Sequence, residues 1–280
     1  MKPRHSFSAR HTRRIDNITR QRESFPKVLL KVINRSDIVI EVLDSRFIDD
    51  TRNQEIENFI KMRGKKIMYA INKIDLTGKD KVRQNYDLKD IFPYVFISAT
   101  KRQGGKELRN KIKALAKQIR KKEDFERVYV GVIGYPNTGK SSIINLLIGK
   151  NSAPTAGQAG FTKGVQKLKL TKEITILDSP GVIPAKEYST VELRAIAKHA
   201  KVGSRTYDKV RDAEMIVARL FKSYADKFQK YYDFETEDSE ELVEYVGKKN
   251  NLFKRGGEVD TDKASRIILR DWQEGNIKAI

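Results

Sequence analysis

Short apolar runs alternate with amphipathic stretches over the first two thirds of the chain. The apolar runs are rich in β-branched residues and predict buried strands at 38–43, 65–71, 94–97, 128–133, 164–170 and 174–177. Apolar residues at helical spacing predict helices at 28–33, 52–63, 105–122 and 142–148. This alternation predicts an α/β fold whose sheet is mostly parallel, with right-handed crossovers and helices on its faces.

The pattern differs on either side of this region. Residues 1–20 contain few apolar positions and predict a mobile basic arm. From about residue 186 the strand signals stop, and helical spacing recurs at 190–200, 206–230, 239–247 and 261–273. We therefore expect three parts: a basic arm at 1–20, an α/β domain at 21–185 and a helical domain at 186–280.

The composition restricts the class of protein. The chain has 280 residues, of which 39% are apolar, enough for a large hydrophobic core. It contains no cysteine, which excludes disulfides and thiolate metal sites. No apolar run approaches the roughly 20 residues of a membrane span, and the N-terminus lacks the pattern of a signal peptide. We expect a soluble, cytoplasmic, monomeric protein with no membrane partner.

The charge is large and unevenly distributed. The formal net charge is +20, and such an excess is typical of proteins that bind nucleic acid. Residues 1–35 carry ten lysines and arginines against two acids, and residues 101–127 carry eleven against four, whereas seven acids gather at 233–244. A lysine-rich solvated surface, as in heat-adapted proteins, is the alternative. Segregated charge favours a surface that binds nucleic acid.

One segment has the pattern of a phosphate-binding loop. Residues 134–141 read G-x-x-x-x-G-K-S and lie between a predicted strand and a predicted helix. The backbone N–H groups of such a loop and of the helix N-terminus can cradle phosphates. Lys140 would reach the β- and γ-phosphates, and the Ser141 hydroxyl would bind magnesium. An ordinary glycine turn is the alternative, which the flanking elements disfavour. The expected phosphate contacts are Asn137, Thr138, Gly139, Lys140, Ser141 and Ser142.

Two further segments predict recognition of a guanine base. They are Asn72-Lys73-Ile74-Asp75, after the strand at 65–71, and Ser98-Ala99-Thr100, after the strand at 94–97. The Asp75 carboxylate can accept hydrogen bonds from guanine N1–H and N2–H₂, a pair that adenine does not offer. The Lys73 stem would pack over the ring, Asn72 would tie loops together, and the Ser98–Thr100 backbone would donate to the guanine oxygen. Taken alone, N-K-x-D is as often a polar loop after a strand.

The last strand is followed by Asp178-Ser179-Pro180-Gly181. Asp178 would hold magnesium through water, and the Gly181 N–H would contact the γ-phosphate. Thr162, in the glycine- and threonine-rich stretch 150–163, is the candidate for a second magnesium hydroxyl. For the segment Asp178–Gly181, a strand-terminating turn is the alternative. Because each motif falls at the carboxyl end of a strand, the sequence predicts one shared site at that edge of the sheet.

These segments together carry a family resemblance. In the order NKID, SAT, GYPNTGKS, GFT and DSPG, they resemble the guanine-nucleotide boxes of translation-factor-related GTPases, with the order rotated. Over residues 25–280 the chain resembles the circularly permuted ribosome-assembly GTPases of the YlqF/RbgA type. Asp44-Ser45-Arg46-Phe47 is similar to that family's D-A-R-x-P stretch, and residues 251–258 with the helix after them are similar to its C-terminal region. The resemblance implies a circularly permuted P-loop GTPase domain and a C-terminal all-α domain, with GTP as substrate and Mg²⁺ as cofactor.

The resemblance also bears on catalysis. Val182 stands where many GTPases have a glutamine that orients water, which implies slow intrinsic turnover. Asn137 matches an asparagine that helps hold potassium in related enzymes, which implies stimulation by K⁺. His5 and His11 are the candidate catalytic histidines, although the arm lacks the family's Gly-His-Met stretch.

We therefore interpret the chain as a GTP hydrolase that couples hydrolysis to binding of ribosomal RNA in a large-subunit precursor. Permutation places the Asp178 loop directly before the helical domain, so movement that depends on the γ-phosphate would act on that domain. The alternative is an RNA-binding scaffold that senses GTP and GDP with negligible hydrolysis, which Val182 permits. A membrane-surface switch is disfavoured, because Asn276–Ile280 contains no prenylation cysteine.

Overall fold

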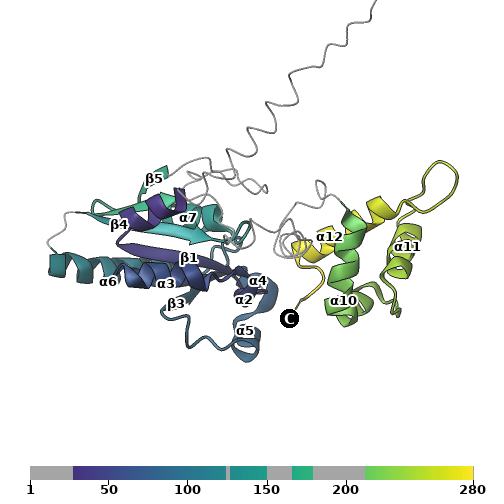
Figure 1. The fold of residues 1–280 in the computed structure, drawn as a ribbon, viewed down its shortest axis with the longest axis horizontal. Coiled ribbons are helices and arrows are strands. Elements are labelled where there is room, and N and C mark those ends of the chain that lie inside the picture. The colour runs from purple at the N-terminus through teal and green to yellow at the C-terminus, as the bar shows by residue number, and fades with distance from the viewer. Residues whose placement is uncertain (1–27, 124–126, 150–165, 179–211, 280) are drawn as a thin grey trace, which may run out of the picture.

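The computed structural model describes residues 28–123, 127–149, 166–178 and 212–279. In this part of the chain a six-stranded sheet with flanking helices is followed by three further helices (Figure 1). The basic arm and the predicted helix at 190–200 lie outside the described residues. No helix among those described is long and apolar enough to cross a bilayer.

The sheet is mostly parallel, as the sequence predicts. Its strands are β1 (Ile38–Asp44), β2 (Lys66–Asn72), β3 (Tyr94–Phe96), β4 (Val128–Gly134), β5 (Gln166–Lys169) and β6 (Ile174–Asp178). Their order is β3-β2-β1-β4-β6-β5, with β5 antiparallel to β6 and the other pairs parallel. Every residue of β1 is buried, because β1 lies inside the sheet and helices cover both of its faces.

Helices cover the sheet on both sides. On one face, α6 (Gly105–Glu123) and α7 (Lys140–Ile148) pack against β1, β4 and β6 through the largest apolar cluster, which includes Val42, Ile112 and Ile144. On the other face, the helix at 28–35 and α3 (Gln54–Met62) pack through Val32 and Ile60. These helices match the predicted ones to within a few residues.

Two local predictions were incomplete. The helix predicted at 52–63 begins only at Gln54, because the Asn53 side chain accepts a hydrogen bond from Ile56 N and caps it. A separate short helix, α2 (Ile48–Thr51), precedes it. The sequence did not predict α4 (Ile74–Thr77) and α5 (Lys79–Asn85), which are short and mostly polar.

The C-terminal helices have a hydrophobic core of their own. They are α10 (Ala213–Tyr232), α11 (Ser239–Lys249) and α12 (Thr261–Glu274), and their described parts match the predicted helical stretches. Trp272 is 1% exposed and stacks on Phe228 with 5.3 Å between ring centroids. Phe47 and Tyr135, from the loops after β1 and β4, join this core. Figure 1 shows the three helices beside the sheet, on the side towards which β1 points.

Candidate functional site

The carboxyl ends of the parallel strands form one edge of the sheet. The chain leaves β1 for β2 on one side and returns to β4 on the other, so a topological switch point lies between β1 and β4. Ligands of open α/β sheets bind at such a point. Asp44 lies opposite Asn72, Gly134 opposite Val42, and Asp178 opposite Val132. The ends of four strands therefore meet at the switch point.

The loop after β4 has the backbone of a phosphate cradle. Gly134, Asn137 and Gly139 have positive φ angles of 148°, 63° and 99°, which turn the chain sharply before α7. The Thr138 hydroxyl donates to Tyr135 O at 2.9 Å and pins the turn. Lys140 begins α7, so the loop leads into a helix N-terminus with its unpaired N–H groups.

Lys140 lies inside this loop. Its ammonium donates to Gly134 O at 3.1 Å and to Tyr135 O at 3.0 Å, and the residue is 7% exposed. Burial lowers the pKa of Lys140 to about 8, although the nearby Asp178 carboxylate opposes the shift. A buried ammonium held by neutral carbonyls is poorly compensated, so phosphate oxygens brought into the loop would be strongly attracted to it.

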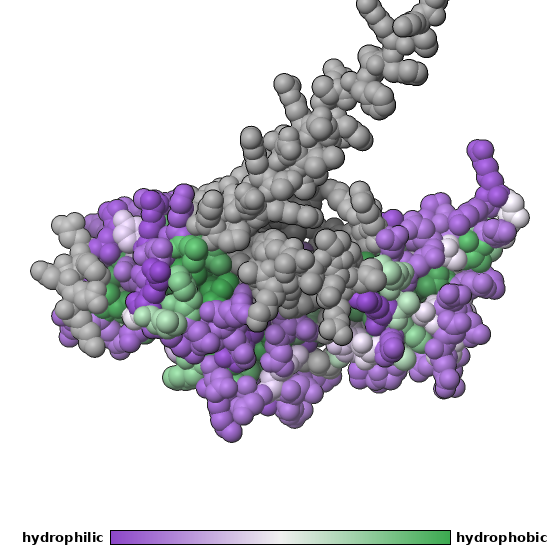
Figure 2. Space-filling model, viewed as in Figure 1, coloured by the Kyte–Doolittle hydropathy of each residue, from purple (hydrophilic) through white to green (hydrophobic). Residues whose placement is uncertain are grey.

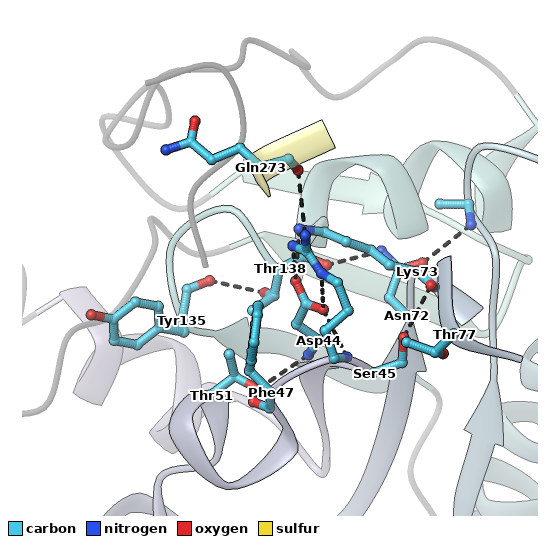
Figure 3. Close-up of polar contacts among 12 residues, drawn as sticks. Asp44, Ser45, Phe47, Thr51, Asn72, Lys73, Thr77, Tyr135, Thr138 and Gln273 are labelled. Atoms are coloured by element: carbon cyan, nitrogen blue, oxygen red, sulfur yellow. Dashed lines mark hydrogen bonds and ion pairs between the residues drawn. The ribbon is translucent and has the colours of Figure 1, made fainter. Parts of the chain in front are cut away.

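Asn72 joins the two segments predicted to read the base (the base-reading segments, Asn72–Asp75 and Ser98–Thr100) to the loop after β4. Its Nδ2 donates to Thr138 O at 2.9 Å, and its Oδ1 accepts from Ala99 N at 3.1 Å (Figure 3). A Cβ atom built at Gly139 would clash with Asn72 Nδ2, so glycine is required there. Asn72 thus ties loops together, as its place in the sequence predicts.

The segment after Asn72 turns sharply into α4. Lys73 has a positive φ of 64°, and Ile74 N donates to Ile97 O at 3.1 Å, which holds the start of α4 against the end of β3. Asp75 lies in the first turn of α4. Its Oδ1 is buried and has no hydrogen-bond partner among the described residues. A buried carboxylate oxygen without a donor fits a ligand that brings N–H groups.

The third segment is held mainly through its backbone. Ser98 N and Gln103 N each donate to the other's carbonyl, at 3.2 and 2.9 Å, which folds Ser98–Thr100 into a tight loop. Ser98 is buried, Ala99 is half-buried and Thr100 is exposed. This loop lies next to the Asn72 segment because Ala99 N donates to the Asn72 amide.

The predicted magnesium ligands are only partly described. Ser141 and Ser142 are half-buried in the first turn of α7, and Asp178 is fully buried at the end of β6. Thr162 and Gly181 lie outside the described residues, as do His5, His11 and Val182. The described residues contain no group of three or more His, Cys, Asp or Glu side chains that could hold a metal ion. A hydroxyl, one carboxylate and nucleotide oxygens fit a magnesium ion that keeps several waters.

No role could be predicted from the sequence for the segment after β1. Asp44, Ser45 and Arg46 are all buried, and Asp44 contacts Lys73 of the base-reading segment. The D-S-R-F pattern identifies this segment in the sequence. Its partners could not be found from the sequence, because Arg46 donates to backbone carbonyls that lie 226 and 227 positions later in the chain.

The loop after β4 has the backbone geometry of a P-loop at the switch point of the sheet, and the two segments predicted to read a base precede it in the chain. Residues 129–250 match a family model described as 50S ribosome-binding GTPase. An uncharacterised GTP-binding protein of Methanocaldococcus jannaschii is 37% identical over 90% of this chain and 65% of its own length. The Saccharomyces cerevisiae nuclear GTP-binding protein NUG1 is 29% identical over 93% of this chain and 56% of its own length.

The fold also has counterparts among solved structures. GNP-bound YlqF from T. maritima has a TM-score of 0.59 and 23% identity, and the match covers 89% of this chain and 93% of that one. The GDP-bound form has the same TM-score with 24% identity, covering 88% and 94%. The chain therefore has the fold of these YlqF structures. It spans less than two thirds of the length of the curated relatives named above.

Proposed function

We propose that this protein hydrolyses GTP to GDP and phosphate and couples this reaction to binding of ribosomal RNA during assembly of the large ribosomal subunit. The observation that carries the nucleotide part is the pair of hydrogen bonds from Asn72 to Thr138 and Ala99. They hold a phosphate cradle and a base-reading loop in one fixed geometry, beside the unpartnered carboxylate oxygen of Asp75. Few ligands other than a guanine nucleotide present phosphates and paired N–H donors together.

Each end of the nucleotide has a distinct chemical partner. The phosphates would lie on the N-terminus of α7 and draw Lys140 out of its contacts with the loop carbonyls. The base would present N1–H and N2–H₂ to Asp75, and the Lys73 stem would cover one ring face. An adenine base would leave the buried Asp75 oxygen unpaired, which makes the site strongly selective for guanine.

The residues at the site fit the expected ions. Ser141, Asp178 and, beyond the described residues, Thr162 would hold Mg²⁺, which supplies positive charge at the β- and γ-phosphate oxygens. We assign K⁺ to Asn137, which is half-buried and held with positive φ in the phosphate loop. Because Val182 cannot orient water, we expect slow intrinsic hydrolysis that both K⁺ and the RNA partner accelerate.

The RNA part of the proposal is supported by charge at the junction between the sheet and the C-terminal helices. A cavity of about 550 Å³ is lined by Lys81 of α5, Lys227, Lys230 and Tyr231 of α10, and Asn276 and Lys278 after α12. Four of these six residues are lysines and none is acidic. Lys81, Lys230 and Lys278 form no ion pair with another described side chain. The charge suits phosphates, and the 42% exposed Tyr231 offers a ring on which a base can stack.

The visible face of the C-terminal helices is predominantly hydrophilic (Figure 2). Around the lysine-lined cavity, hydrophilic side chains and the exposed Tyr231 ring suit an RNA that is bound chiefly through its phosphates. The description of the matching family as ribosome-binding supports the same partner.

A scaffold that senses GTP and GDP without useful hydrolysis is the second candidate function. It is favoured by Val182, an apolar residue at the position where many GTPases have a glutamine that orients water. The two functions predict different kinetics, since only the hydrolase is accelerated by its partner.

Single-turnover hydrolysis of GTP separates the two functions. The assay compares protein alone with protein plus large ribosomal subunits from the same organism, in K⁺ and in Na⁺ at equal ionic strength. The hydrolase predicts a rate at least about tenfold faster with subunits, and faster in K⁺ than in Na⁺. A rate that neither the subunits nor the cation alters would leave only the scaffold.

Salt-dependent binding of ribosomal RNA tests the lysine-lined cavity. The double variant Lys227→Gln/Lys230→Gln is compared with Lys248→Gln/Lys249→Gln, which removes the same charge from the end of α11. We expect only the first to weaken binding several-fold, and to lower the slope of log affinity against log salt by about 1 to 2. Equal losses in both variants would show that binding depends on total charge and not on this cavity.

A further inference from the structure

The segment Asp44-Ser45-Arg46-Phe47 lies at the switch point of the sheet but belongs to none of the nucleotide boxes. Asp44 is 0% exposed and Arg46 is 3% exposed. Burial of charged side chains is unfavourable unless they are paired in good geometry. Two buried charges next to the proposed nucleotide site must therefore be compensated by the groups that they contact.

Asp44 holds two cations at once. Its Oδ2 lies 2.8 Å from Arg46 Nη2 and 2.8 Å from Lys73 Nζ, and its Oδ1 accepts from Arg46 Nε at 3.0 Å (Figure 3). Burial alone would raise the pKa of Asp44, but the two cations outweigh it and hold the pKa well below its usual range. Lys73 is the lysine of the base-reading segment, so this carboxylate fixes where its ammonium lies.

Ser45 also contacts the segment that contains Lys73, mainly through that segment's backbone carbonyls. The Ser45 hydroxyl donates to Lys73 O at 3.0 Å and accepts from the Thr77 hydroxyl at 3.0 Å. Ser45 N donates to Asn72 O at 2.9 Å. The segment after β1 thus supports the base-reading loop with side-chain and backbone contacts.

Arg46 reaches from this carboxylate to the C-terminal helices. Its Nη1 donates to Trp272 O and to Gln273 O, each at 3.4 Å. These carbonyls belong to the last turn of α12, where carbonyls carry partial negative charge, and Trp272 O also accepts from Gly275 N at 3.2 Å. Phe47 stacks on the Trp272 ring, with 5.9 Å between centroids and 24° between planes. One short segment thus contacts both the base-reading loop and the end of α12.

We propose that Asp44 and Arg46 are positioning residues that couple binding of the guanine base to the packing of the C-terminal end of α12 against Arg46 and Phe47. We call this packing the seating of α12. The inference rests on the proposed guanine-nucleotide site and names its regulation. A bound guanine ring would hold the Lys73 stem in place, and the Lys73 ammonium would then stay on Asp44. The two hydrogen bonds from Arg46 to the Asp44 carboxylate would then be kept, and Arg46 would continue to donate to the α12 carbonyls.

The coupling must act in both directions. A seated α12 fixes Arg46 and Asp44 and so preorganises Lys73 before the base arrives, which favours binding. If nucleotide strengthens the seating of α12, seating strengthens nucleotide binding by the same factor. An RNA that pulls on α12 would therefore loosen the guanine pocket, and this gives the partner a route to nucleotide release.

The chain carries its own reporter for this contact. Trp272 is its only tryptophan, and it packs between Phe47 and Phe228 at the junction. We expect Mg²⁺–GDP and Mg²⁺–GTP, titrated into the full chain, to change Trp272 fluorescence with the same dissociation constant that calorimetry gives. A tryptophan analogue free in solution corrects for light absorbed by the nucleotide.

Two variants separate positioning from coupling. Asp44→Asn keeps the shape but removes the charge that holds Lys73, and we expect it to weaken GDP binding at least about fivefold and to abolish the Trp272 response. Arg46→Lys keeps a cation for Asp44 but cannot also reach the α12 carbonyls. It should lose the Trp272 response with a smaller loss of GDP affinity. Asp49→Asn removes the same charge at an exposed position in α2, and it should alter neither the Trp272 response nor the GDP affinity.

The outcomes distinguish this inference from the proposed function. If wild-type protein takes up no guanine nucleotide, the proposed function fails and the coupling fails with it. If nucleotide binds but Trp272 fluorescence does not change, or if Asp44→Asn binds GDP as tightly as wild type, the coupling alone is overturned. Should Asp44→Asn not fold, the wild-type titration and Arg46→Lys still decide.

Discussion

Replacing Asn72 with alanine tests the hydrogen bonds that join the phosphate loop to the loop at Ser98–Thr100. The change removes the hydrogen bonds to Thr138 O and from Ala99 N, each worth about 1 kcal/mol net. It also leaves the buried Thr138 carbonyl without this donor, which costs about 1 to 2 kcal/mol more. We expect Asn72→Ala to lower the free energy of unfolding by about 2–4 kcal/mol, and the melting temperature by roughly 5–15 °C.

Calorimetric melting with and without GDP measures both consequences. Because the phosphate loop and the base-reading loop are no longer joined, GDP affinity should fall at least about tenfold and the stabilisation by GDP should shrink accordingly. Asn85→Ala is the matched control, since the Asn85 amide donates only to Lys81 O on the exposed face of α5. Melting and GDP affinity in Asn72→Ala that match those of Asn85→Ala would refute the reasoning.

Two further predictions concern protons. Because the pKa of Lys140 is lowered to about 8 by burial, and phosphate would favour its charged form, GDP binding should take up about half a proton at pH 8 and almost none at pH 6. Calorimetry in buffers of different ionisation enthalpy measures this uptake; equal uptake by Lys140→Arg would contradict the assignment. The pKa of Glu41 is raised well above 4.5 by burial and by the Glu57 carboxylate. Wild-type stability relative to Glu41→Gln should therefore fall as pH rises above 4.5. Urea unfolding across pH checks this, and a constant difference would contradict it.

The meeting of the predicted motifs at one edge of the sheet could be expected from the sequence, because parallel strands bring their carboxyl ends to one edge. The pairings of Asp44 with Asn72 and of Val132 with Asp178 follow from strands of similar length that begin level with each other. Glycines in the phosphate loop likewise follow from geometry, since a side chain at Gly139 would occupy the place of the Asn72 amide.

The junction with the C-terminal helices could not be predicted. Arg46 binds backbone carbonyls of α12, and a backbone carbonyl leaves no trace in the residue pattern. The short helices α4 and α5 were missed for a related reason. Their residues show no helical spacing of apolar positions, and Gly78 between them, with φ of 84°, decides where one ends and the next begins.

Equilibrium binding of GTP and ATP to wild-type protein and to Lys140→Ala tests the central claim most directly. The convergence of Asp75, Asn72 and Lys140 at one edge of the sheet predicts that wild-type protein binds GTP at least about a hundredfold more tightly than ATP. It also predicts that Lys140→Ala, which lacks the ammonium that meets the phosphates, loses most of this affinity. Equal binding of GTP and ATP, or undiminished GTP binding by Lys140→Ala, would contradict the account.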